Sequence, residues 1–134
     1  MSLCNCKCSC SILSAIASLI IGVIAAFLQI TGTITVTPAF LWVAAGVGIG
    51  YLAILLLSAS IQQHCAGCSC LCAALSTLLI GALGTIFFAV ILLAVGIVAT
   101  SIVSAILVGL LLFFLSLLIS TTACLIRHLF DCGN

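Results

Sequence analysis

Four long apolar stretches, separated by short polar or cysteine-rich segments, dominate the hydrophobic pattern of this chain. They cover residues 11–30, 40–61, 73–98 and 102–126. A helix needs about 20 apolar residues to cross a hydrocarbon core of about 30 Å, so each stretch is long enough for one crossing. The pattern therefore predicts an all-α fold, a membrane-type bundle of four transmembrane helices.

The distribution of charge indicates the same environment. No Asp, Glu, Lys or Arg occurs between Lys7 and Arg127, and charged residues make up 2% of the 134 residues. The mean hydropathy is +1.73. Because a water-exposed domain needs about a quarter of its surface charged, this composition excludes an ordinary soluble monomer. It predicts a membrane protein, or an assembly subunit whose apolar flanks are covered by its neighbours.

An internal repeat organises the four stretches. The Cys-rich segment 6–14 recurs as 68–76, and each copy leads into an apolar run that contains Ile-Gly, at Gly22 and at Gly81. Each copy holds two spans, so both Cys-rich heads are predicted on one side of the membrane, in two tandem parallel-repeat hairpins. This predicts a single domain with the following parts: a Cys-rich head (1–10), hairpin 1 (11–61), a Cys-rich connector (62–72), hairpin 2 (73–126) and a polar tail (127–134).

The two turns inside the hairpins are uncharged and contain no cysteine. The first, 31–38, is rich in Thr and ends at Pro38, a residue suited to the first turn of a helix. The second falls around 96–101, where Thr100 or Ser101 is a candidate N-cap.

This topology gathers all the cysteines on one side, a feature we call the cysteine face. The formal charges Lys7, Arg127 and Asp131 share that side with His64 and His128. The ten cysteines are Cys4, Cys6, Cys8, Cys10, Cys65, Cys68, Cys70, Cys72, Cys124 and Cys132.

The chemistry of the cysteine face depends on its compartment. In an oxidising compartment the thiols pair as disulfides, and the alternating Cys-x-Cys strips suit cross-links between segments or between copies. In a reducing compartment they stay free or bind a soft metal such as zinc or copper. Only Cys65 and Cys68 have the spacing usual for zinc, with His64, Cys70 and Cys72 beside them. Lys7 and Arg127 favour a cytoplasmic orientation, but two charges leave the orientation open.

The apolar stretches offer little for catalysis or transport. They contain no acid or base, and one amide, Gln29, near an end. An enzyme needs a nucleophile with a base and an orienting group, and none is found, so we expect no enzymatic activity and no cofactor. A channel or small exporter ranks third, behind a structural role and a metal-binding role, because ion paths are lined by polar or ionisable groups.

Small residues recur at the four-residue spacing that lets transmembrane helices pack closely. The pairs are Gly22 with Ala26, Gly46 with Gly50, and Gly81 with Thr85. This spacing predicts helix contacts, and it is the same for packing within one bundle and for packing between copies.

The segments 34–43 and 70–79 resemble small, Cys-rich, four-span hypothetical proteins of endospore-forming Firmicutes, and the likeness covers most of the chain. That group has no known activity. The resemblance implies a bacterial source and a spore or envelope context.

Together these features favour a structural, self-assembling protein of a membrane or of a cell or spore envelope. Its partners would be further copies of itself and lipid, with no nucleic acid. The alternative is a membrane-anchored thiolate site for zinc or copper.

Overall fold

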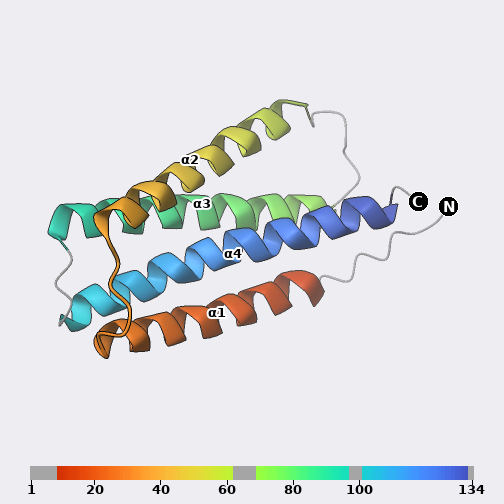
Figure 1. The fold of residues 1–134 in the computed structure, drawn as a ribbon. Coiled ribbons are helices and arrows are strands. Elements are labelled where there is room, and N and C mark those ends of the chain that lie inside the picture. The colour runs from red at the N-terminus through yellow and green to blue at the C-terminus, as the bar shows by residue number, and fades with distance from the viewer. Residues whose placement is uncertain (1–8, 62–68, 97–100, 133–134) are drawn as a thin grey trace.

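The computed structural model describes the backbone of residues 9–61, 69–96 and 101–132, and the side chains of residues 12–57, 74–96 and 101–127. Within these ranges the chain forms four helices, drawn in Figure 1. They are α1 (Ser9–Ile30), α2 (Pro38–Ile61), α3 (Ser69–Val95) and α4 (Ile102–Cys132). The predicted all-α four-helix bundle is therefore confirmed.

The helices alternate in direction, and their packing order differs from their order along the chain. Extensive contacts join α1 to α4, α4 to α3 and α3 to α2. The helices of the first repeat, α1 and α2, thus lie at opposite sides of the bundle, joined by a connector that crosses one end (Figure 1). Because this connector is extended rather than a tight turn, α1 reaches α4 and packs there instead of against α2.

Two of the helices end at a glycine, and a third begins at a proline and has a threonine N-cap. Gly32 has a φ of 70°, and the backbone N–H groups of Gly32 and Thr33 donate to the carbonyls of Gln29 and Leu28, a Schellman ending for α1. Gly96, with a φ of 78°, ends α3. Thr37 caps α2 by accepting the Phe40 N–H on its hydroxyl at 3.4 Å, with Pro38 in the first helical position.

All four helices are long and apolar enough to cross a membrane, over Ile12–Ile30, Pro38–Leu57, Ala74–Val95 and Ile102–Arg127. The predicted hydrophobic membrane protein is thus supported by the length and composition of the helices. Helix α4 is longer than the sequence pattern predicts. Its 31 residues measure about 46 Å, so it continues past Arg127, the last residue of the apolar span, and ends at Cys132.

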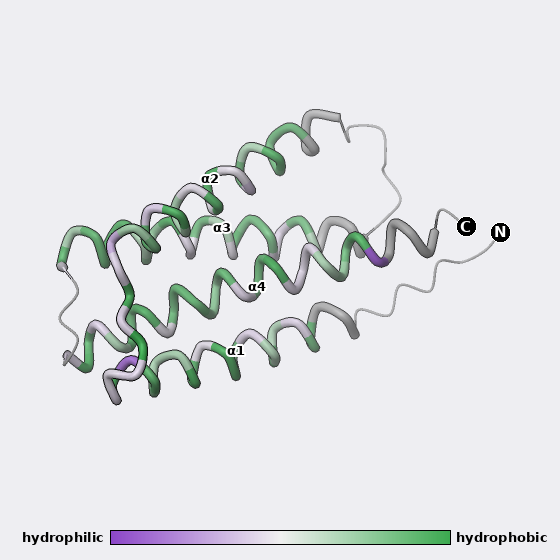
Figure 2. Tube along the Cα trace, viewed as in Figure 1, coloured by the Kyte–Doolittle hydropathy of each residue, from purple (hydrophilic) through white to green (hydrophobic). Residues whose placement is uncertain are grey.

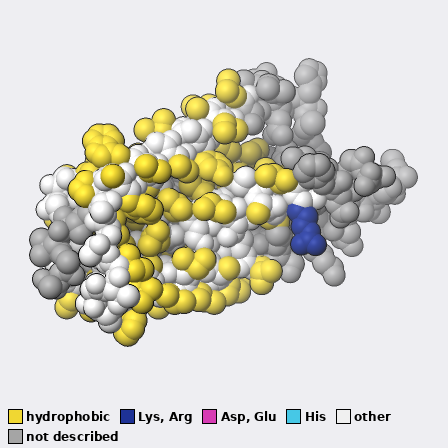
Figure 3. Space-filling model, in the orientation of Figure 1, with side chains coloured by type: hydrophobic (Ala, Val, Ile, Leu, Met, Phe, Trp, Pro, Cys, Tyr) yellow, Lys and Arg dark blue, Asp and Glu magenta, His cyan; other side chains and the backbone are white. Residues whose placement is uncertain are grey.

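Large apolar side chains cover the outside of the bundle, and its inside combines leucines with small and hydroxyl-bearing residues. Figure 2 shows that hydrophobic residues run along all four helices, and Figure 3 shows hydrophobic side chains over the visible surface. Phe27, Trp42 and Phe87 are each more than half exposed, whereas Ser18 and Thr85 are completely buried. A water-soluble bundle has the opposite arrangement, so lipid or other apolar surfaces are the solvent that this exterior fits.

Candidate functional site

The first candidate site is the end of the bundle where the cysteine face was predicted. The first residues of α1 and α3 and the last residues of α2 and α4 lie together at this end (Figure 1). Arg127 lies there too, exposed, on the last turns of α4. Cys124, half-buried on α4, is disulfide-bonded.

Most of the predicted cysteine site falls outside the described residues. Cys10, Cys70, Cys72 and Cys132 lie within helices, but their side chains are not among those described. No group of three or more His, Cys, Asp or Glu residues that could hold a metal occurs among the described positions. The metal site on His64, Cys65, Cys68, Cys70 and Cys72 therefore remains a prediction. Of all the residues predicted on the cysteine face, Cys4, Cys6, Cys8, His64, Cys65 and Cys68 lie wholly outside the described ranges.

The closest helix contact joins α1 to α4 along what we call the α1/α4 seam: Ser14, Ser18, Gly22 and Ala26 facing Gly109, Phe113 and Thr121. A Cβ atom added at Gly22 would lie 2.9 Å from the Phe113 Cβ and 3.0 Å from the Gly109 carbonyl oxygen. One added at Gly109 would lie 2.8 Å from the Ala26 Cβ. Only glycine permits this approach of the two backbones, and the sequence pattern had not identified Gly109.

Hydroxyl groups of the α1/α4 seam form hydrogen bonds inside the bundle. The Ser14 and Thr121 hydroxyls lie 3.3 Å apart, joining the two helices near the cysteine end. The Ser18 hydroxyl donates to the Ser14 carbonyl at 2.8 Å. These bonds satisfy polar groups that lipid cannot hydrate.

A second close contact, between α3 and α4, depends on glycine and aromatic packing. Gly81 lies against Leu118, and the buried Thr85 hydroxyl donates to the Gly81 carbonyl at 2.8 Å. At Gly84, an added Cβ would lie 2.5 Å from the Phe114 ring. Phe114 stacks on Phe88 with ring centroids 5.6 Å apart. Gly84 is a contact residue that the four-residue spacing did not indicate, because it belongs to a three-residue step from Gly81.

On α2 the glycines divide between two faces. Gly48 faces α3, where an added Cβ would lie 2.7 Å from a side-chain carbon of Ile86. Gly46 and Gly50 are exposed, and an added Cβ at either would meet no atom within 4 Å. The predicted Gly46/Gly50 pair therefore lies on the outer surface of the bundle, away from its helix contacts.

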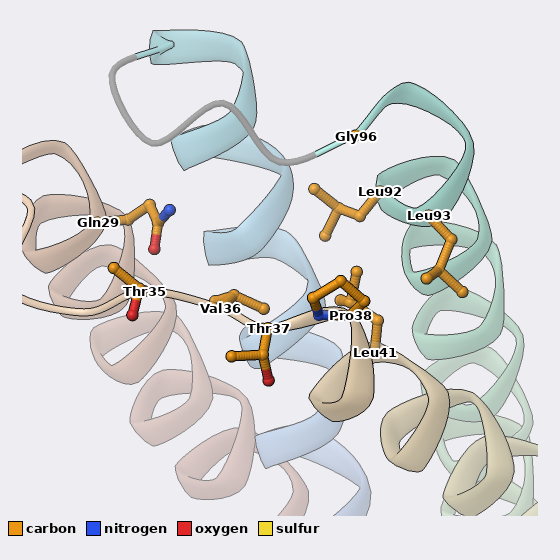
Figure 4. Close-up of a pocket in the computed structure, with 9 residues that line it drawn as sticks. All are labelled: Gln29, Thr35, Val36, Thr37, Pro38, Leu41, Leu92, Leu93 and Gly96. Carbon is orange, nitrogen blue, oxygen red and sulfur yellow. The ribbon is translucent and has the colours of Figure 1, made fainter.

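The opposite end of the bundle contains a cavity of about 410 Å³ between the ends of α1 and α3 and the start of α2 (Figure 4). Its walls are mainly apolar and include Pro38, Leu41 and Leu92. Gln29, 1% exposed, borders it, and neither its amide nitrogen nor its amide oxygen has a hydrogen-bond partner among the described residues. Within the described part of the chain, the Gln29 amide is thus a buried polar group with no hydrogen bond to offset the loss of water.

We expect Gln29→Leu to stabilise the bundle by about 1–3 kcal/mol, because leucine removes an unpaired buried amide while keeping a similar volume. Unfolding in mixed micelles of mild detergent and dodecyl sulfate measures the change. The control is Ile30→Leu at the neighbouring exposed position, which should leave the midpoint unchanged. A loss of stability in Gln29→Leu would show instead that the amide is bonded, for example to a water in the cavity.

Comparisons with protein-family models, with curated proteins and with solved structures found no match for this chain.

Proposed function

We propose that this chain is a structural, non-enzymatic protein that self-associates side by side in a membrane or in a cell or spore envelope. Apolar helix faces would pack between copies, and the cysteine face would cross-link them. The observation that carries this proposal is the outward position of Gly46 and Gly50 within an apolar surface.

Helix α2 is the best placed of the four helices for contact with another copy. It lies at one side of the bundle and packs extensively only against α3. Its outer face carries the open Gly46/Gly50 pair beside the exposed side chains of Val43 and Val47. In lipid, such small-residue faces drive association because they let two backbones approach and gain dispersion contacts. Two copies meeting through α2 would each bury this face.

The cysteine end supports covalent locking of such an assembly. Cys124 is disulfide-bonded, which is the state expected in an oxidising compartment rather than in a reducing cytosol. Because both termini of the bundle and its Cys-rich connector were predicted on this side, neighbouring copies would present thiols to one another at one level. The spore or envelope setting suggested by the family resemblance fits such a compartment.

The thiol state of native material tests the proposal. Membranes are alkylated before and after reduction, and intact mass and non-reducing gels are compared. Oxidised cysteines with a reducible ladder of oligomers support the proposal. A monomer in mild detergent whose thiols are all free contradicts it, and stoichiometric zinc or copper in that monomer favours the thiolate metal site instead.

We expect Gly46→Leu to weaken self-association at least tenfold without unfolding the monomer. The new side chain meets no atom of its own bundle within 4 Å, but it would hold a second α2 away from the glycine pair. Oligomer distribution in mild detergent after reduction measures the effect. Ala17→Leu, a small-to-large change on the exposed surface of α1, is the matched control and should leave the distribution unchanged. An unchanged distribution in Gly46→Leu would remove α2 as the interface.

A further inference from the structure

We propose that the disulfide partner of Cys124 is Cys10 of the same chain, so that one bond fastens α1 to α4 while the remaining cysteines are left for links between copies. The inference deepens the proposed function and rests on it only in requiring an oxidising compartment. The proposal follows from the register of the α1/α4 seam, that is, from which residues of α1 lie opposite which residues of α4.

The two helices are antiparallel and advance in matched steps. Ala26 lies against Gly109, Gly22 lies against Phe113, and Ser14 lies beside Thr121. Four residues from Ala26 to Gly22 are matched by four from Gly109 to Phe113, and the eight from Gly22 to Ser14 are matched by eight from Phe113 to Thr121. Four residues further on, this register pairs position 10 with position 125. Cys124 therefore lies within one residue, about 1.5 Å along the helix, of the level of Cys10.

Both positions also belong to the faces that meet. Residues three or four apart share a helix face. Cys10 is four residues before Ser14, and Cys124 is three residues after Thr121. The residues of α4 that meet α3, Phe114 and Leu118, lie on a different side from Gly109 and Phe113. By helical periodicity Cys124 lies nearer the side that meets α1 than the side that meets α3.

The spacing of the two helices suits a disulfide. A disulfide joins residues whose Cα atoms are about 4.4–6.8 Å apart, which is closer than most helix pairs allow. The seam is lined by small residues, and Gly22 and Gly109 bring the two backbones into contact. Cys10 is the one cysteine that α1 contains. Cys70 and Cys72 lie on α3, which packs against the other side of α4.

Formation of the bond is an oxidation of two thiols. The sulfurs of Cys10 and Cys124 become joined, and their two protons and two electrons pass to an oxidised dithiol, whose own disulfide becomes two thiols. The thiol–disulfide oxidants of an oxidising compartment belong to this class.

The test must identify the partner and show that both halves belong to one chain. The wild-type chain is co-expressed with a mass-marked form carrying Ile12→Val and Ile119→Val, two conservative changes at exposed positions. Unreduced, alkylated protein is digested with trypsin and chymotrypsin. Cleavage after Lys7, Leu13, Leu118 and Leu125 releases peptide 8–13, with Cys8, Cys10 and one mark, and peptide 119–125, with Cys124 and the other mark.

We expect these two peptides to be linked by a disulfide. In each linked pair, either both peptides or neither should carry its mark, because both come from the same chain. Fragmentation should place the link at Cys10, Cys8→Ser should retain it, and Cys10→Ser should abolish it and expose Cys124 to alkylation. The inference is overturned by linked peptides of which one alone is marked, by alkylated Cys124 in the wild type, or by a link to another cysteine. Fragmentation of the linked peptides from the wild-type protein identifies the partner of Cys124 even if a variant does not fold.

The same samples separate the two proposals. A Cys10–Cys124 link in protein that runs only as a monomer on non-reducing gels would support the inference and contradict the cross-linked assembly. A reducible ladder in which Cys124 is joined to a cysteine other than Cys10 would do the reverse.

Discussion

Replacing Gly109 by leucine should detach α1 from α4 and cost at least about 3 kcal/mol of bundle stability. The atoms nearest to an added Cβ are the Ala26 Cβ at 2.8 Å and the Gly22 carbonyl oxygen at 2.9 Å. Neither atom belongs to a flexible side chain that can swing aside, so the helices must separate. Separation forfeits the dispersion contacts of the whole seam and the hydrogen bond between Ser14 and Thr121.

Titration with dodecyl sulfate in mixed micelles, followed by near-ultraviolet circular dichroism, measures this loss. The matched control is Ala123→Leu, the same kind of enlargement at an exposed position of the same helix, which should shift the midpoint by less than about 0.5 kcal/mol. Equal midpoints for Gly109→Leu and the wild type would show that α1 and α4 are not held together through this seam.

Such close contacts matter more here than in a soluble bundle. Lipid chains solvate leucine as well as another helix does, so burial of apolar side chains between helices gains little. The core clusters accordingly combine small residues, such as Ala44 and Ala89, with interdigitating leucines. Stability in this setting comes from backbone approach, shape and inward hydrogen bonds. For the same reason, single glycines carry large predicted effects.

The number of helices and their membrane-spanning type could be predicted from the lengths of the apolar stretches, because a bilayer requires a minimum number of consecutive apolar residues in each span. The order of packing could not. The small residues of α1 mark a face suited to close packing, but nothing in the sequence shows which helix meets that face, and α1 contacts α4 rather than α2. Helix α4 also continues beyond the predicted span, because Arg127 and Asp131 interrupt the hydropathy without interrupting the helix.

The spacing of small residues predicted the packing sites only in part. It identified the pair Gly22 and Ala26 but not their partner Gly109, although Ala105 and Gly109 on α4 have the same four-residue spacing. On α2 the spacing singles out Gly46 and Gly50, whereas the glycine at the α3 contact is Gly48. The spacing of small residues thus identifies positions where another helix could pack closely. Only the fold shows which of these positions contact a helix of the same chain.

Loss of the Cys124 disulfide should cost about 2–4 kcal/mol. A bond that closes a loop of roughly 100 residues restricts an unfolded chain by up to about 4.7 kcal/mol, but helices persist in micelles, so less entropy is removed.

A double-mutant cycle in mixed micelles tests both this stabilisation and the proposed partner. Cys124→Ser, Cys10→Ser and the double variant should all lose the same amount, because either serine alone already breaks the bond. Losses that add in the double variant would show that the two sulfurs act separately. No loss in either single variant would mean that the Ser14–Thr121 bond and the glycine contacts hold α1 without covalent help. Equal losses in the two single variants and the double variant would show that Cys10 and Cys124 form one bond, which joins α1 to α4 independently of any link between copies.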